Sequence, residues 1–325
     1  MNSNNNFNET KISKSTISKA LNHCYGVNSN LRERILNDYS HLGTRKNISE
    51  IDMYVIVPET PRYFWKCRLP KASNPSVKVK YNIITSVGDI SVILHYLKEA
   101  EDLGAKVIVL VSPGHPEVEK EIERLSQGRL IIYLNSFNET KNTFFIGPDP
   151  IKEGEDLAEL CIKHHPKSSR LLVLTSNSNY KSLKSRNRFS GFFNKIEGIV
   201  QYDIISIPKY TKSPSFPAAI SRILNEYLQN SDFGSVVCFD GITTKVCSAL
   251  RKLKNVTGHN ALCFGFENNP QNEPFAESGI LKAIIYSNFQ EQLIAAGKAA
   301  EEYLINGSHP SSKYVFLPHY IKLYE

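Results

Sequence analysis

Three carboxylate side chains stand directly after apolar stretches that read as buried β-strands. Asp149 follows TFFIGP, Asp240 follows SVVCF and Glu267 follows ALCFGF. Because the carboxyl ends of parallel strands meet at one edge of a sheet, we expect these carboxylates on a common rim, where each could bind neighbouring hydroxyls of a sugar. Helix N-capping would use Asp149 and Asp240 equally well. An acid–base pair, as in glycosidases, is a third possible use.

A group of cationic side chains marks the start of a predicted helix. They are Lys181, Lys184, Arg186 and Arg188, and no acid lies among them. Cations at a helix N-terminus oppose the helix dipole, and an anionic partner would account for their presence. Exposure to solvent and screening by salt make the cost small, so an ordinary solvated helix face is the alternative interpretation.

Aromatic and hydroxyl side chains after two further strands complete the candidate site. Tyr63, Phe64 and Trp65 follow the first predicted strand, and their rings could stack on the apolar face of a sugar. The alternative is that they close one end of a lobe as core residues. Ser287 and Asn288 follow another strand, and they are candidates for ligand contact or for a hinge.

From residue 51 onward, short apolar runs alternate with helical patterns. Strands are predicted at 53–57, 80–85, 106–111, 129–134, 143–147, 170–175, 202–207, 235–240, 261–266 and 282–287, with one or two more within 313–324. Helices are predicted at 88–104, 115–125, 151–165, 184–196, 216–230, 244–254 and 288–307. This alternation predicts parallel sheets covered by helices on both faces. About ten strands are too many for one open sheet, so we expect an α/β fold of two doubly wound lobes with a ligand cleft at the strand carboxyl ends.

The stretch ISKSTISKALN, residues 12–22, predicts an amphipathic helix of a different kind. Ser13 is a suitable N-cap, and Ile17, Ala20 and Leu21 share one face. The opposite face carries small or cationic hydrogen-bonding groups, namely Lys14, Ser15, Ser18, Lys19 and Asn22. Such groups read base edges and contact phosphates in DNA-binding helices. A solvated helix face is the alternative.

Composition narrows the class of protein. The 325 residues contain 41% hydrophobic and 22% charged residues, as in water-soluble globular proteins, and no apolar run has the length of a membrane helix. The start of the chain lacks the pattern of a secretory signal, so a cytoplasmic location is expected. The six cysteines include no CxxC pair and are expected as buried, reduced thiols, and no motif predicts a metal or cofactor. The formal charge of +7 fits contact with nucleic acid without requiring it.

The order of these motifs resembles the lactose-repressor (LacI/GalR) family of transcription regulators. ISKSTISKALN is similar to the family's recognition helix, V-S-x-x-T-V-S-R-V-L-N, and VNSNLRERILNDYSHLG to its third helix. RNRFSGF resembles the R-x-x-G-F element, CFDGITTKVCSAL resembles A-N-D-x-x-A-x-G-x-x-x-A-L, and CFGFENN resembles V-V-G-F-D-D. The resemblance implies DNA contacts from Ser13, Lys14, Ser15, Thr16, Lys19, Asn22 and Arg32. It implies that Arg188, the arginine of the R-x-x-G-F element, contacts an effector oxygen. With the residues that follow the predicted strands, the expected effector contacts are Tyr63, Phe64, Trp65, Asp149, Arg188, Asp240, Glu267 and Ser287.

Two segments depart from the family pattern. The family's apolar first helix is replaced by NSNNNFNETK, whose Asn residues favour turns, and the hinge helix that enters the minor groove is absent from GTRKNISEID. Phe239 stands where the family has Asn, and Glu267 stands where it has Asp, which suggests an unusual ligand.

The predicted organisation is a DNA-binding segment at 1–45, a linker at 46–52 and an effector-binding domain at 53–325. One lobe is expected from about 53–149 and 287–314, and the other from about 150–284 and 317–325. We expect a non-enzymatic regulator that binds operator DNA as a homodimer and responds to a small carbohydrate, without contact to a membrane. The alternative is a soluble sugar-binding protein whose DNA-binding segment has degenerated, and a glycosidase is a third possibility.

Overall fold

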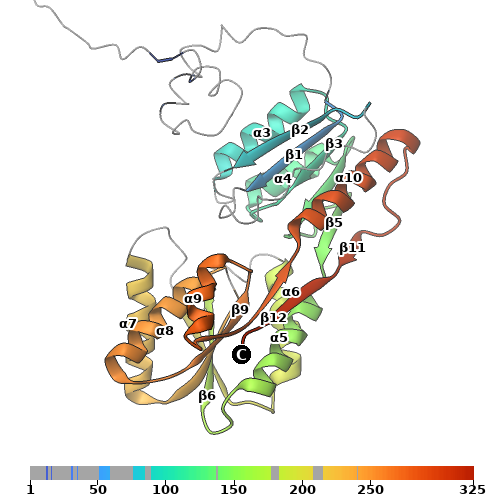
Figure 1. Ribbon diagram of the computed structural model, residues 1–325. Coiled ribbons are helices and arrows are strands. Elements are labelled where there is room, and N and C mark those ends of the chain that lie inside the picture. Colours follow the sequence, from blue (N-terminus) through green and yellow to red (C-terminus); the bar gives the residue numbers. More distant parts are fainter. Residues whose placement is uncertain are drawn as a thin grey trace, which may run out of the picture. The chain divides into compact units, whose positions relative to one another are not determined.

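The computed structural model of the chain is shown in Figure 1. It describes residues 12, 13, 16, 31, 35, 51–58, 76–84, 89–136, 138–176, 183–207, 215–239 and 241–325. The chain separates into two compact units, residues 1–50 and residues 51–325.

Three residues of the predicted amphipathic helix are described in the first unit, namely Ile12, Ser13 and Thr16. Thr16 is helical, and its backbone N–H donates to the Ser13 hydroxyl oxygen at 3.0 Å. The predicted N-cap at Ser13 is therefore confirmed, because this bond satisfies one of the free N–H groups of a first helical turn. The other predicted DNA contacts, Lys14, Ser15, Lys19, Asn22 and Arg32, lie outside the described residues, so a helix-turn-helix stays a prediction.

The second unit contains two sheets of six strands each, which confirms the predicted α/β two-lobed fold. The first has the order β11-β5-β4-β3-β1-β2, formed by Tyr314–Leu317, Thr143–Pro148, Leu130–Leu134, Val107–Leu110, Met53–Pro58 and Val79–Ile84. The second has the order β12-β10-β9-β8-β6-β7, formed by His319–Leu323, Leu281–Ser287, Leu262–Phe266, Phe233–Cys238, Arg170–Ser176 and Tyr202–Ile207. Among the paired strands described, β10 and β12 alone run antiparallel.

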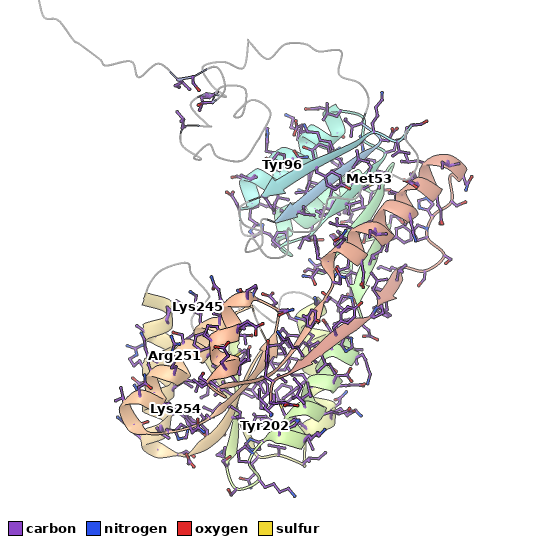
Figure 2. All side chains as sticks on the ribbon, viewed as in Figure 1. Met53, Tyr96, Tyr202, Lys245, Arg251 and Lys254 are labelled. Carbon is purple, nitrogen blue, oxygen red and sulfur yellow. The ribbon has the colours of Figure 1, made fainter. Side chains whose placement is uncertain are left out.

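Helices cover both faces of each sheet, as parallel strands require. In the first sheet, α3 (Ile90–Asp102) and α4 (Pro116–Leu125) pack on one face and α10 (Phe289–Asn306) on the other. In the second, α5 (Pro150–His164) and α6 (Leu183–Ile196) pack on one face. The opposite face receives α7 (Ser215–Asn230), α8 (Thr243–Thr257) and α9 (Glu273–Glu277). Met53 and Tyr96 lie in the first of these packed bodies, whereas Tyr202 and the α8 side chains Lys245, Arg251 and Lys254 lie in the second (Figure 2).

The chain passes between the two sheets three times. β5 leads into α5 through Asp149, β10 leads into α10 through Asn288, and β11 leads into β12 through Pro318. We call lobe 1 the first sheet with α3, α4 and α10, and lobe 2 the second sheet with α5 to α9. Each lobe therefore contains segments that are far apart in the sequence.

The strands lie where the apolar runs predicted them. The main elements that the sequence did not predict form one short segment after β9. Every residue of β3, β4 and β8 is buried, because strands between two helical layers contact apolar groups on both sides. The turn η4 (Pro270–Asn272) and α9 were not predicted, since α9 has only five residues and shows no helical periodicity. No helix among the described residues is long and apolar enough to cross a membrane.

The cysteines of lobe 2 are reduced and buried, as predicted. Cys161, Cys238, Cys247 and Cys263 are free thiols within its core. Burial raises the pKa of the Cys161 thiol well above its ordinary value, which keeps that group protonated and unreactive.

Candidate functional site

A group of charged and amide side chains gathers at the carboxyl ends of strands in both lobes. We call it the polar cluster, and it consists of Asn135, Glu153, Lys184, Arg188 and Glu267. Open α/β sheets bind ligands outside the carboxyl ends of their strands, so this is where a ligand site is expected. The sequence singled out Lys184, Arg188 and Glu267, but not Asn135 or Glu153.

Two glycines bring α5 and α6 close enough for the central ion pair of the cluster. A Cβ atom on Gly154 would lie 2.1 Å from the Arg188 carbonyl oxygen, and one on Gly191 would lie 2.1 Å from the Ile151 carbonyl oxygen. At this separation the fully buried Glu153 accepts two hydrogen bonds from Arg188, Nε to Oε2 at 2.7 Å and Nη2 to Oε1 at 2.8 Å. The bidentate geometry fixes the guanidinium group in one orientation.

An aromatic ring also contacts the guanidinium group of Arg188. The Arg188 Cζ atom lies 3.9 Å from the centroid of the Phe266 ring, within the range of a cation–π contact. The sequence predicts an anionic partner for the cations at the start of α6. For Arg188 that partner is a side chain of the same chain, Glu153. The prediction found no acid because Glu153 lies on the preceding helix.

Lys184 connects the two lobes through a nearly buried amine. Its Nζ donates to Asn135 Oδ1 at 2.7 Å and lies 4.0 Å from Glu153 Oε2, while the side chain is only 8% exposed. Leu183 beside it packs against the core of lobe 1. Burial and the neighbouring Arg188 lower the pKa of Lys184 to about 7, although Glu153 and Glu267 act in the opposite direction. The solvated-face interpretation is therefore wrong for Lys184.

Glu153 is held ionised by the two cations. Burial by itself would raise the pKa of this carboxyl, but Arg188 and Lys184 outweigh that effect and hold the pKa below its ordinary value. The sequence contained a signal for this role. Glu153 lies on the buried face of α5 together with Gly154 and Leu157, and a charged residue on such a face requires a partner.

Glu267 presents an exposed carboxylate at the end of β9. Its φ of +74° is unusual for a residue with a side chain, and two bonds maintain it. The Glu267 N–H donates to the Ile285 carbonyl at 2.9 Å, and its own carbonyl accepts from Asn272 Nδ2 at 3.2 Å. A Cβ atom on Gly241 would lie 2.7 Å from Glu267 Oε2, so this glycine leaves the space that the carboxylate occupies.

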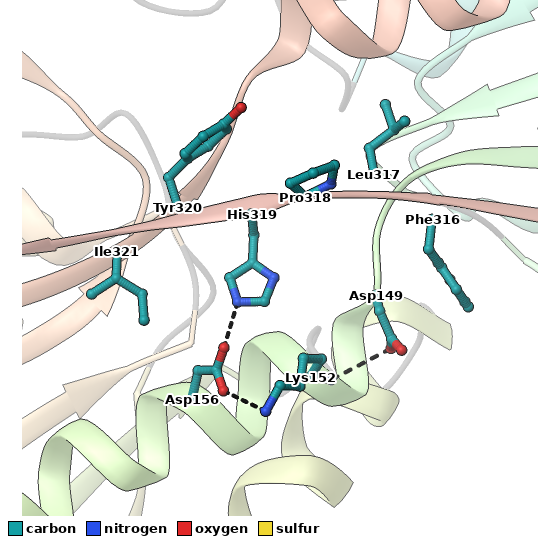
Figure 3. Close-up of a pocket in the computed structure, with 9 residues that line it drawn as sticks. All are labelled: Asp149, Lys152, Asp156, Phe316, Leu317, Pro318, His319, Tyr320 and Ile321. Carbon is teal, nitrogen blue, oxygen red and sulfur yellow. Dashed lines mark hydrogen bonds and ion pairs between the residues drawn. The ribbon is translucent and has the colours of Figure 1, made fainter.

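Asp149 and Ser287 lie at the passages between the lobes. Asp149 caps α5 by accepting from the backbone N–H groups of Ile151 and Lys152, so the capping interpretation applies to it. It also borders an open depression lined by Lys152, Asp156 and residues 316–321 (Figure 3). The Ser287 hydroxyl accepts from Gln292 Nε2 at 3.1 Å. Contact of these residues with an effector stays a prediction.

The remaining predicted effector residues, Tyr63, Phe64, Trp65 and Asp240, lie outside the described residues. The cluster that is described offers hydrogen-bond donors and acceptors from both lobes, fixed by ion pairs and ring packing. Such an arrangement suits recognition of a polar molecule through directed hydrogen bonds.

Comparisons with solved structures find proteins that share this fold. A carbohydrate transporter solute binding protein from Agrobacterium radiobacter, in complex with D-arabinose, has a TM-score of 0.70 at 16% identity, covering 85% of this chain and 95% of that chain. GanP, a glucose-galactose binding protein from Geobacillus stearothermophilus, has a TM-score of 0.70 at 14% identity, covering 84% of this chain and 98% of that one.

A putative LacI transcriptional regulator from Bacteroides fragilis is also similar, with a TM-score of 0.65 at 12% identity, covering 84% of this chain and 97% of that chain. At such identities the likeness shows the fold alone, and membership of the lactose-repressor family stays a prediction. No curated protein sequence matches the chain. A family model described as "Periplasmic binding protein domain" matches residues 79–308. The chain therefore belongs to the periplasmic binding protein domain family.

Proposed function

We propose that residues 51–325 bind a small carbohydrate at the carboxyl ends of the two sheets. The observation that carries this proposal is the polar cluster, in which Lys184 of lobe 2 reaches Asn135 of lobe 1 at 2.7 Å. A ligand that contacts both lobes at this place would stabilise one relative arrangement of them, which is how binding becomes a conformational signal.

The chemistry of the cluster favours a sugar. Sugar hydroxyls both donate and accept, and the cluster offers a carboxylate acceptor on Glu267 together with the donor groups of Lys184 and Arg188. The glucose-galactose binding protein and the arabinose complex support the same ligand class by their fold. A glycosidase would in addition hydrolyse the ligand, so an assay with a panel of glycosides separates the two functions.

The binding experiment is a thermal-shift screen of aldoses, followed by calorimetry on those that raise the melting temperature. We expect at least one neutral aldose to bind, and Glu267→Gln to weaken it at least tenfold, because an acceptor of hydroxyl protons is lost. Glu277→Gln, an exposed position in α9, is the control and keeps the wild-type affinity. If no sugar in the panel binds the wild-type chain, carbohydrate binding is rejected.

A second candidate function concerns the first unit. We propose that residues 1–45 contact operator DNA in a homodimer whose sugar-binding units control the affinity. The supporting observation is the Ser13 cap on the helical residue Thr16, at the position that the family pattern implies for the start of its recognition helix. A protein that keeps sugar binding but has lost this contact would fit the alternative of a degenerated regulator.

Fluorescence anisotropy against the promoter region of the gene itself tests this second candidate. Full-length protein is expected to bind more tightly than a variant that lacks residues 1–45, with an affinity that falls steeply with salt because phosphate contacts release counterions. Lys19→Ala weakens binding to the promoter more than to random DNA, whereas Lys313→Ala leaves both unchanged. Equal binding by the full-length and shortened proteins at low salt would favour the degenerated regulator.

A further inference from the structure

We propose that Glu153 sets the charge of the accepted ligand: its ion pair with Arg188 makes the site select neutral sugars over anionic ones. The inference rests on the proposed sugar-binding function and names the residue that restricts its ligand class. Glu153 does not need to touch the sugar, because it acts through the guanidinium group that it holds.

The ion pair occupies the edge of Arg188 that would otherwise bind an anion. A guanidinium binds carboxylate or phosphate most strongly through two parallel N–H groups. In this chain Nε and Nη2 donate to Glu153 at 2.7 Å and 2.8 Å, so this two-donor edge is occupied. The Phe266 ring, 3.9 Å from the guanidinium carbon, opposes rotation of the group toward a ligand. Arg188 can then offer a sugar single hydrogen bonds from Nη1, the nitrogen that this pair does not use.

The charges of the cluster also disfavour an anion. Glu153 neutralises Arg188, so within the polar cluster the carboxylate of Glu267 and the amine of Lys184 remain. With the pKa of Lys184 near 7, these four groups together carry a charge between zero and minus one at neutral pH or above. An anionic ligand therefore gains no net attraction from these four groups, and the exposed carboxylate of Glu267 repels it.

The competing explanation is that Glu153 only stabilises the packing of α5 against α6. In that case its replacement would weaken all ligands by a similar factor through loss of packing. A charge-selecting role instead predicts that the ratio of affinities for neutral and anionic sugars changes, because removal of the carboxylate leaves an uncompensated positive charge on the partly buried Arg188.

Calorimetry with matched ligands tests the proposal. Each aldose that binds is compared with its uronic acid and its 1-phosphate, which place the charge at opposite ends of the sugar. The wild-type chain is expected to bind the neutral sugar at least tenfold more tightly than either anion. Glu153→Gln, which keeps the shape of the side chain, is expected to reduce this ratio at least tenfold for one of the anions.

Glu159→Gln is the matched control. Glu159 lies on the same helix and pairs with Lys195 of α6 at 3.0 Å, but both side chains are exposed, so this variant keeps the wild-type ratio. Glu153→Asp retains the charge and is expected to keep the selection against anions even where the Gln variant does not fold. A wild-type preference for the anion, or an unchanged ratio in Glu153→Gln, overturns the proposal while sugar binding itself stands. Absence of binding by every neutral sugar overturns the proposed function as well.

Discussion

Each lobe has a carboxylate held near the carboxyl ends of its strands, but by different partners. In lobe 1, Glu119 of α4 accepts hydrogen bonds from the hydroxyl groups of Ser112, Tyr133 and Thr140. In lobe 2, Glu153 is held by two cations, Arg188 and Lys184. Hydroxyl donors are neutral, so they fix the geometry of the strand ends without altering the local charge balance. Cationic partners also determine how much positive charge the site can offer a ligand.

The two networks differ in whether the charge of a partner can change near neutral pH. Burial and the carboxylate of Glu119 raise the pKa of Tyr133 far above its ordinary value, so its hydroxyl stays protonated and acts as a permanent donor. Lys184, in contrast, has a pKa of about 7, and the lobe 2 network changes its charge within the neutral range. We therefore expect substitutions of Glu119 to affect stability, and substitutions around Glu153 to affect stability, ligand choice and pH dependence together.

The largest effect is expected from Glu153→Ala. It leaves the nearly buried amine of Lys184 and the partly buried guanidinium of Arg188 without their carboxylate, which costs about 3–5 kcal/mol in the free energy of unfolding. Urea denaturation measures this loss. Glu159→Ala, at an exposed pair on the same two helices, is expected to cost about 1 kcal/mol or less. Similar losses in the two variants would show that Glu153 is not under the electrostatic constraint described above.

A pH-dependent effect is expected from Lys184→Met. The pKa of Lys184 is lower in the folded chain than in the unfolded chain, so the unfolded chain binds the extra proton above pH 7. The wild-type contribution therefore grows as pH rises from about 7 toward 10, by at most about 1.4 kcal/mol per pH unit. Because the methionine variant lacks this proton, its stability relative to wild type should fall over the same range. Urea denaturation at pH 6, 8 and 9.5 measures this trend, and a constant difference would contradict it.

The smallest effect is expected from Glu119→Gln. The amide retains the shape and one acceptor, so we expect a loss of about 1–2 kcal/mol in the free energy of unfolding. Its affinity ratio for neutral and anionic sugars should equal that of wild type, because no cation is freed. Calorimetry with the matched sugars checks this, and a changed ratio would remove the distinction between the two carboxylates.

Much of the fold could be predicted from the sequence because its strands lie between helical layers. Runs such as those in β3 and β8 are apolar on both faces, and the structure places strands there within a few residues of the prediction. The cap at Asp149 and the cap at Ser13 were also visible as local patterns. Such features depend on neighbouring residues, which a sequence displays directly.

The polar cluster could be predicted only in part, because its contacts join distant segments. Arg188 and Glu267 were identified, but the partner of Arg188 is on another helix and that of Lys184 is Asn135 in the other lobe. The close approach of α5 and α6 depends on Gly154 and Gly191 meeting backbone atoms of the opposite helix. Gly191 belongs to the R-x-x-G-F element, but neither that element nor the sequence around Gly154 indicates which backbone the glycine meets.

The most direct test of carbohydrate binding at the polar cluster is a crystal structure of the chain with an aldose selected by the thermal-shift screen. We predict that the sugar lies at the strand carboxyl ends of both lobes, with hydroxyl groups hydrogen-bonded to Glu267 and Arg188, and that the pair between Glu153 and Arg188 is retained. A sugar bound instead in the depression beside Asp149 and Asp156, with the polar cluster unoccupied, would contradict this account.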